Sequence, residues 1–419
     1  AIYQKAMSYG ALGNQSNKIV TLEQMITSNR QSAFYDDAMY ELGQTYLINN
    51  QDDRALSYFS RLVREQSRSP FSKKALLRSG LIYYNNDQNN QAINSLKNVI
   101  RNYQGSAEST EALATLKNIY VSENRVNEFI QFSRSVGINS ISVNEQDSLS
   151  FSAAENQYLE GNMNSALSSM KSYIRNYPNG AYLTSANFYV GEIAFGKENY
   201  DEALQAYEYV NRQRVSRHSE TALLKASRIN YNQKNYQAAL NNYTVLYDLA
   251  DDENSRHEAQ VGSMRCNFKL GNYGMSIDPA KALLKSPKVT TDQIAEAHFI
   301  LAKSYHETNR RDLAKSEFNI TEKLNDSEQA AEAKYHLALY EFQDRNYKEC
   351  EKLLFELADQ YSYYDYWLAS GFILLADNYL AQDNSFQAKQ TLQSIIDNYE
   401  GDDLRRIATE KLQRIEANE

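Results

Sequence analysis

The chain has 419 residues, of which only 15 are glycine and 4 are proline, and this scarcity of turn formers argues against collagen-like and turn-dense all-β folds. Its 53 acidic and 44 basic residues give a net charge of −9, which disfavours duplex nucleic acid as a ligand because that ligand requires a basic surface. The longest apolar stretch, residues 366–376, is too short to span a bilayer. We therefore expect a helical protein that neither binds nucleic acid nor spans a membrane.

A small residue recurs along the chain at intervals of 36 to 38 residues, with Phe129 standing in its place once. These positions are Ala55, Ala92, Ala166, Ala203, Ala239, Ser276, Ala314, Cys350 and Ala388. Twelve residues before each lies a second column that is mostly glycine or alanine, as at Gly43 and Gly191. The flanking segments carry apolar residues at helical spacing and are separated by a short polar turn. Each unit is therefore predicted to be a helical hairpin whose helices approach closely at the two small columns.

In chain order, the pattern divides into five parts. They are an N-terminal capping hairpin (1–35), regular repeats (36–116), an irregular repeat or hinge (117–147), regular repeats (148–401) and a C-terminal capping helix (402–419). In the third part Lys117 and Phe129 replace the small residues, so we expect either a change of curvature or a mobile hinge between two subdomains. The last helix is either a cap or the first helix of a further unit. The predicted fold is an all-α, right-handed superhelical solenoid of about ten to eleven hairpins.

The segment VGEIAFGKENYDEALQAY (190–207) carries a small residue after an apolar one, an aromatic residue near the turn, and then alanine followed by a second aromatic residue. This pattern resembles the tetratricopeptide repeat, and it recurs in segments such as LGQTYLINNQDDRALSYF and LADNYLAQDNSFQAKQTL. The period exceeds the usual 34 residues, which implies longer helices or longer turns.

Unit endings such as RNYPNG (175–180) resemble those of bacterial cell-envelope repeat proteins, the relatives of outer-membrane assembly lipoproteins and of the Tol-Pal-associated repeat protein. This second resemblance implies a periplasmic or outer-membrane-associated protein, with a cytoplasmic location as the alternative. The chain starts AIYQKAMSYG, without an initiator methionine, so we expect that a targeting segment has been removed or that the sequence is part of a longer protein.

Motifs that carry chemistry are scarce in the sequence. No glycine-rich phosphate loop follows a predicted strand, and the five histidines do not share the spacing of metal ligands. The two cysteines, Cys266 and Cys350, are too few for a disulfide framework. We therefore predict no cofactor, no metal and no enzymatic activity.

A binding surface remains the best functional prediction, because the first helix of each hairpin is expected to line a concave groove. The predicted partner-binding residues are Arg228, Arg265, Lys303, Tyr231, Phe268, Phe299, Phe188, Phe195 and Glu192. The aromatic residues would supply contact area, and the charges would make one half of the groove acidic and the other basic. A ligand with acidic groups would then lie toward Lys303.

The same charges also allow a structural interpretation. Glu192 would pair with Arg228, while Glu258 and Glu296 would neutralise Arg265 and Lys303 and leave a solvated face. Three functions follow: a scaffold that holds a protein segment in its groove, a structural component of an envelope assembly without a specific ligand, or the repeat region of a larger enzyme. The oligomeric state and the partner's identity are left open.

Overall fold

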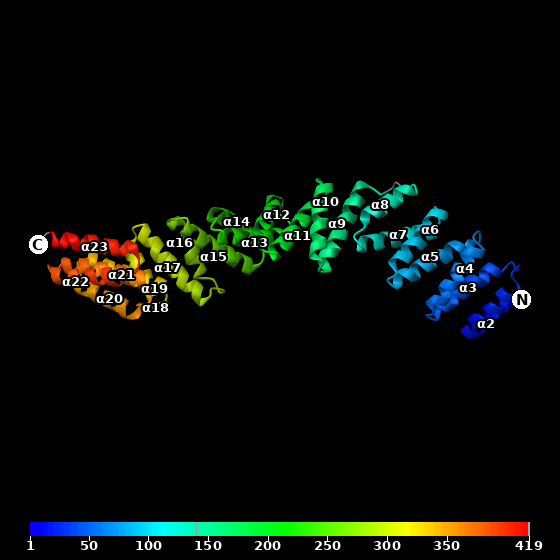
Figure 1. Ribbon diagram of the computed structural model, residues 1–419, viewed down its shortest axis with the longest axis horizontal. Coiled ribbons are helices and arrows are strands. Elements are labelled where there is room, and N and C mark those ends of the chain that lie inside the picture. Colours follow the sequence, from blue (N-terminus) through cyan, green and yellow to red (C-terminus); the bar gives the residue numbers. More distant parts are fainter. Residues whose placement is uncertain (139–140, 214, 418–419) are drawn as a thin grey trace. The chain divides into compact units, whose positions relative to one another are not determined.

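A computed structural model of the chain describes residues 1–138, 141–213 and 215–417. Within this part of the chain it contains 23 α-helices and no strand, which confirms the prediction of an all-α fold built from helical hairpins. The chain divides into two compact units, residues 1–198 and 199–419, which are described separately below. Figure 1 shows the helices following one another in hairpin order within each unit.

The first unit contains five complete hairpins and one additional helix. Its helices are α1 (Ile2–Ala11), α2 (Gln15–Ser28), α3 (Tyr35–Ile48), α4 (Asp52–Glu65), α5 (Pro70–Asn85), α6 (Asn89–Asn102), α7 (Ala107–Ser122), α8 (Val126–Ser135), α9 (Val143–Leu159), α10 (Met163–Asn176) and α11 (Leu183–Gly196). The odd-numbered helices α3, α5, α7 and α9 are the first of their hairpins and carry the column that begins at Gly43.

The second unit begins with one helix, continues with five complete hairpins and ends with a further helix. Its helices are α12 (Tyr200–Arg212), α13 (Ser219–Asn232), α14 (Tyr236–Leu249), α15 (Glu253–Lys269), α16 (Tyr273–Leu283), α17 (Thr291–Glu307), α18 (Arg311–Leu324), α19 (Glu328–Gln343), α20 (Tyr347–Gln360), α21 (Asp365–Leu380), α22 (Ser385–Asn398) and α23 (Asp402–Glu416).

The turns inside the hairpins share one backbone feature, a residue with positive φ just before the second helix. These residues are Gly13, Asn50, Asp87, Asn124, Gly161, Glu198, Lys234, Gly271, Asn309, Arg345 and Asp383, with φ between 56° and 82°. From Gly13 on they are 36 to 38 residues apart, the same interval as the small column. The turn of the N-terminal hairpin is therefore in register with the other ten turns, and all eleven share this backbone feature.

The two small columns lie where the helices of a hairpin approach each other. Ala55 and Ala92 are fully buried, and a Cβ added at Gly43 would collide with the ring of Phe59 on α4. A Cβ added at Gly80 would lie 2.8 Å from Cδ2 of Leu96 on α6. In these two hairpins the large side chain four residues after the small residue of the second helix thus fills the space that the glycine leaves.

The fourth hairpin, α7 with α8, departs from this pattern. Its second helix, α8, has only 10 residues, and Phe129 takes the place of the small residue, buried with its ring 6.3 Å from that of Tyr120. Lys117 reaches Glu145 on α9, with 3.6 Å between Nζ and Oε1. The bulky Phe129 thus takes the position of the usual small residue in the hairpin whose second helix, α8, is short.

The division into compact units falls between Glu198 and Asn199, so the irregular repeat at 117–147 lies inside the first unit. Residues 139–140 of that repeat, and residues 418–419 of the proposed C-terminal cap, lie outside the described residues. The five parts proposed from the sequence stay predictions.

Candidate partner-binding surface

The first helices of successive hairpins form one layer in each unit, because they contact one another as well as their own hairpin partners. In the second unit α13 contacts α15, and α19 contacts both α17 and α21. We call this the first-helix layer. Six of the predicted partner-binding residues lie on it in the second unit, on α13, α15 and α17, and the other three lie on α11 of the first unit.

The three predicted cations of the second unit each form an ion pair with a glutamate on the next first helix. Arg228 Nη2 lies 3.0 Å from Glu258 Oε1. Arg265 binds Glu296 through two hydrogen bonds, from Nε to Oε1 at 2.7 Å and from Nη2 to Oε2 at 2.6 Å. These contacts correct the pairing expected from the sequence, which assigned Glu258 to Arg265 and Glu296 to Lys303.

Lys303 instead pairs with Glu332 on α19, with 2.7 Å between Nζ and Oε1. Partners in these pairs are about 30 residues apart, which is one repeat minus nearly two helical turns. Each glutamate therefore lies nearly two turns closer to the N-terminus of its helix than the position equivalent to its arginine or lysine. A similar separation of 31 residues joins two aromatic residues of the first unit, Tyr40 and Phe71, whose ring centroids are 5.1 Å apart.

Exposure of the three ion pairs decreases along the layer. The side chains are 48% and 45% exposed for Arg228 and Glu258, and 19% and 15% exposed for Lys303 and Glu332. An exposed pair contributes at most about 1 kcal/mol, because water competes for both charges. Arg228 is therefore the cation of this row that an outside carboxylate can most readily engage.

The aromatic residues of the second unit divide into buried and half-buried rings. Phe299 is only 7% exposed and meets Phe268 edge-on, with 6.2 Å between ring centroids. The open groove position expected for Phe299 is thus not observed, because its ring fills the α15–α17 interface. Tyr231 is half-buried, with its ring 5.4 Å from that of Tyr236, and no described residue hydrogen-bonds its hydroxyl. Burial raises the pKa of Tyr231, and the charge of Arg265 opposes this shift.

In the first unit, Phe188, Glu192 and Phe195 are half-buried on α11. The Phe188 ring lies 5.9 Å from that of Tyr189. Glu192 lies near Tyr158 on α9, where its charge adds to burial in raising the pKa of that phenol. These three residues therefore place an acidic and aromatic surface on the last helix of the first unit.

A cluster around Lys303 was not expected from the sequence. The rings of His306 on α17 and His336 on α19 lie 4.7 Å apart, His306 Nδ1 lies 2.7 Å from Tyr340 Oη, and Lys303 Nζ lies 3.4 Å from His336 Nε2. The two histidines occupy different positions in their repeats, which concealed their proximity; the 30-residue offset would have revealed it. Among the described residues, no three His, Cys, Asp or Glu side chains are placed to hold a metal ion.

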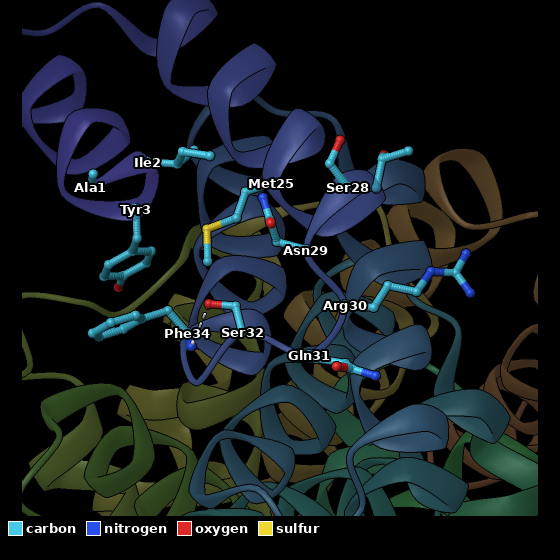
Figure 2. Close-up of a pocket in the computed structure, with 11 residues that line it drawn as sticks. Ala1, Ile2, Tyr3, Met25, Ser28, Asn29, Arg30, Gln31, Ser32 and Phe34 are labelled. Carbon is cyan, nitrogen blue, oxygen red and sulfur yellow. Dashed lines mark hydrogen bonds between the residues drawn. The ribbon is translucent and has the colours of Figure 1, made fainter.

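A cavity of about 770 Å³ lies beside the N-terminal hairpin and is lined mainly by the start of α1 and by the end of α2 with the turn that follows it. Figure 2 shows the Tyr3 and Phe34 rings lying parallel at one side of it, and their centroids are 5.1 Å apart. Burial, together with the charges of Glu41 and Asp37, raises the pKa of Tyr3 to about 12. The wall combines apolar side chains, such as Ile2 and Met25, with polar ones from the end of α2 and the following turn, and Arg30 adds a charged side chain.

Among the helices of the described residues, none combines the length and apolar character needed to traverse a lipid bilayer.

The tetratricopeptide repeat family model matches residues 37–69, 74–106 and 372–401. The first two matches cover most of α3 with α4 and of α5 with α6, and the third covers the second half of α21 together with α22. No protein of curated function matches the sequence.

Several solved structures are similar to the chain. Yeast Tom70 is 12% identical with a TM-score of 0.36, over 100% of this chain and 95% of that one. The P58(IPK) TPR domain is 14% identical with a TM-score of 0.27, over 100% and 98%. A tetratricopeptide repeat protein from Parabacteroides merdae is 13% identical with a TM-score of 0.29, over 62% and 97%. The three matched segments are therefore similar to tetratricopeptide repeats, and the other hairpins share their turn.

Proposed function

We propose that the protein is a non-catalytic scaffold that binds a segment of a partner protein on the first-helix layer of its second unit. Tetratricopeptide repeats generally mediate protein–protein interaction, and the chain carries repeats that match this family. The observation that carries the proposal is the half-exposed pair of Arg228 and Glu258, which lies one helical turn from the half-buried ring of Tyr231.

The partner segment carries an acidic side chain next to an apolar one. Its carboxylate replaces that of Glu258 as the ion-pair partner of Arg228. The loss of the existing pair costs little free energy because both of its side chains are about half exposed. Its apolar side chain packs on the Tyr231 ring. The more buried pairs of Arg265 and Lys303 hold α15, α17 and α19 in place beside this contact.

In the first unit, the acidic and aromatic surface of α11 offers a second contact for a partner. Glu192 would attract a basic group, and Phe188 and Phe195 would supply apolar area. A partner that uses both surfaces carries basic and acidic groups on separate segments.

The experiment is a comparison of charge reversals. The wild-type protein is used as bait, the partner is identified and purified, and its affinity is measured for wild type, Arg228→Glu and Arg212→Glu. Arg212 is the matched control, because it lies on α12 of the same unit and its side chain is 78% exposed in an i,i+4 pair with Glu208.

We expect Arg228→Glu to weaken binding by about tenfold or more and to flatten its salt dependence, with little change in melting temperature. Arg212→Glu should bind like the wild type. Equal affinities for wild type and Arg228→Glu would place the partner on another surface.

We also propose a periplasmic or outer-membrane-associated location, supported by the resemblance of unit endings such as RNYPNG to those of cell-envelope repeat proteins. Cell fractionation with an antibody against the protein tests it, and recovery in the cytoplasmic fraction would contradict it.

A further inference from the structure

A second surface lies in the second unit, where the last hairpin (α21 with α22) packs beside α20 of the hairpin before it. A cavity of about 400 Å³ is lined by Phe355 of α20, by Phe372 and Leu375 of α21, and by Phe386 of α22. A cavity of about 200 Å³ adjoins it and shares Phe372 and Ser394 with it. We call the combined depression the α20–α22 groove. Both cavities run along α21, so the groove follows that helix.

The internal repeat shows that Phe355 has an unusual residue type for its position. It lies five residues after the small residue Cys350, and the equivalent position in each of the other nine repeats is polar or charged, for example Lys97, Glu208 and Asn319. The fold therefore does not need an apolar residue at this position, since nine equivalent hairpins form with a polar one. The phenyl ring at 355 therefore needs an explanation specific to this hairpin.

The same comparison singles out Phe386, which lies two residues before the small residue Ala388. The equivalent positions elsewhere hold polar residues or glycine, for example Asp53, Asn164 and Lys348. Two independent exceptions to the repeat thus line one cavity. Single exposed apolar residues are common on proteins, whereas two that converge on one groove mark an interaction surface.

Both rings are exposed in the isolated chain. Phe355 is 49% exposed and Phe386 is 71% exposed, while Leu375 beneath them is 2% exposed. Tyr379, at the Phe386 end, donates a hydrogen bond from its hydroxyl to Glu351 Oε1 at 2.8 Å, which holds its ring in the wall. The groove therefore has a fixed apolar floor and two exposed aromatic rings at its rim, and covering them removes apolar surface from water.

The other end of the groove is acidic. Asp365, the first residue of α21, and Glu400, which follows α22, both line the smaller cavity and are exposed. No described residue forms an ion pair with either carboxylate. A ligand with a positive charge at this end would gain two favourable interactions that the chain itself does not supply.

We propose that the α20–α22 groove binds an amphipathic helix of a partner protein, with its apolar stripe on Phe355 and Phe386 and a lysine or arginine at the Asp365 end. The α21 segment from Asp365 to Tyr379 is about 21 Å long, which matches about four turns of a partner helix. A helix satisfies its own backbone groups, so it can cover the apolar floor formed by α21 while its polar flank meets Gln387, Gln390 and Thr391 of α22. This surface is separate from the first-helix layer proposed above.

The probes are two fluorescein-labelled peptides of about 16 residues, both with leucines at i, i+3, i+4 and i+7 and otherwise alanine and glutamine. One carries lysines in the terminal turn and the other carries glutamates there. Fluorescence anisotropy with the full chain should show saturable binding of the lysine peptide, at least about tenfold tighter than that of the glutamate peptide.

The variants separate the two contributions. Phe386→Asp and Phe355→Ser should each weaken the lysine peptide by about tenfold or more, with unchanged helical circular dichroism. Asp365→Asn combined with Glu400→Gln should retain binding and remove the preference for lysine. Leu313→Asp is the matched control, because Leu313 on α18 is also 49% exposed but does not line the groove.

The proposal is overturned if the lysine peptide does not bind saturably, or if it binds Phe386→Asp and Leu313→Asp equally well. It is also overturned in favour of a second copy of this chain if light scattering shows a dimer that Phe386→Asp dissociates. Equal affinities for the lysine and glutamate peptides would contradict the proposed lysine or arginine at the Asp365 end.

Discussion

The guanidinium of Arg265 and the carboxylate of Glu296 meet through two parallel hydrogen bonds across the α15–α17 interface. These bonds raise the pKa of Arg265. Arg228 and Glu258 form the equivalent contact one repeat earlier, but both side chains are about half exposed. The same kind of pair therefore occurs twice in neighbouring repeats, in two different environments.

A double-mutant cycle measures this difference. Replacing Arg265 by alanine should lower the free energy of unfolding by about 1–3 kcal/mol, because Glu296 loses a two-bond partner in a partly buried site. Replacing Arg228 by alanine should cost less than about 1 kcal/mol. Denaturant unfolding of the single and double variants gives both coupling energies, and equal values would contradict the environmental explanation.

Gly43 provides a test of the hairpin packing. Its replacement by alanine forces the new Cβ into the Phe59 ring, so we expect a loss of about 1–3 kcal/mol in the free energy of unfolding. Gly274→Ala is the control, because the space around Gly274 at the start of α16 is open within 4 Å and alanine favours the helix by about 0.5–1 kcal/mol. Thermal unfolding should shift in opposite directions for the two variants.

The shared turn predicts that two substitutions increase stability. Lys234 and Arg345 both have φ of 63°, a conformation that disfavours residues with a Cβ. Lys234→Gly and Arg345→Gly should each raise the free energy of unfolding by about 0.5–1 kcal/mol. Gln233→Gly, where φ is −78°, should not stabilise. A gain at Gln233 equal to that at Lys234 would show that positive φ is not the cause.

The histidine cluster predicts a dependence of stability on pH. Burial, followed by the charge of His336, lowers the pKa of His306 from the model-peptide value of 6.5. The unfolded chain therefore binds a proton more readily than the folded one, and stability should fall as the pH decreases through about 6.5. The melting temperature of the wild type should drop more between pH 7.5 and 5.5 than that of His306→Gln. Parallel profiles would exclude His306 as the cause.

The hairpins were predictable from the sequence because their spacing is a property of the chain alone. The small residues at Ala55 and its equivalents recur wherever two helices must approach, so their interval gives the number and length of the units. The N-terminal hairpin was predicted from its apolar pattern, while its turn at Gly13 could not be assigned to the same register without the backbone angles.

The contacts between repeats were not predictable from aligned positions. The ion pairs between neighbouring first helices join positions that are nearly two turns out of register, whereas the sequence comparison paired equivalent positions. This error assigned Glu296 to Lys303 rather than to Arg265 and left the contact of His306 with His336 unnoticed. It also placed Phe299 in an open groove rather than between α15 and α17.

The common turn has a consequence for how the array can change in length. Lys234 and Gly271 are 37 residues apart and have the same backbone conformation, so removing residues 235–271 would join one hairpin turn to another in register. The excision would place α13 next to α17 and bring Arg228 opposite Glu296, whose own arginine would be gone. The array could thus lose this one repeat and still join neighbouring first helices by an arginine–glutamate pair.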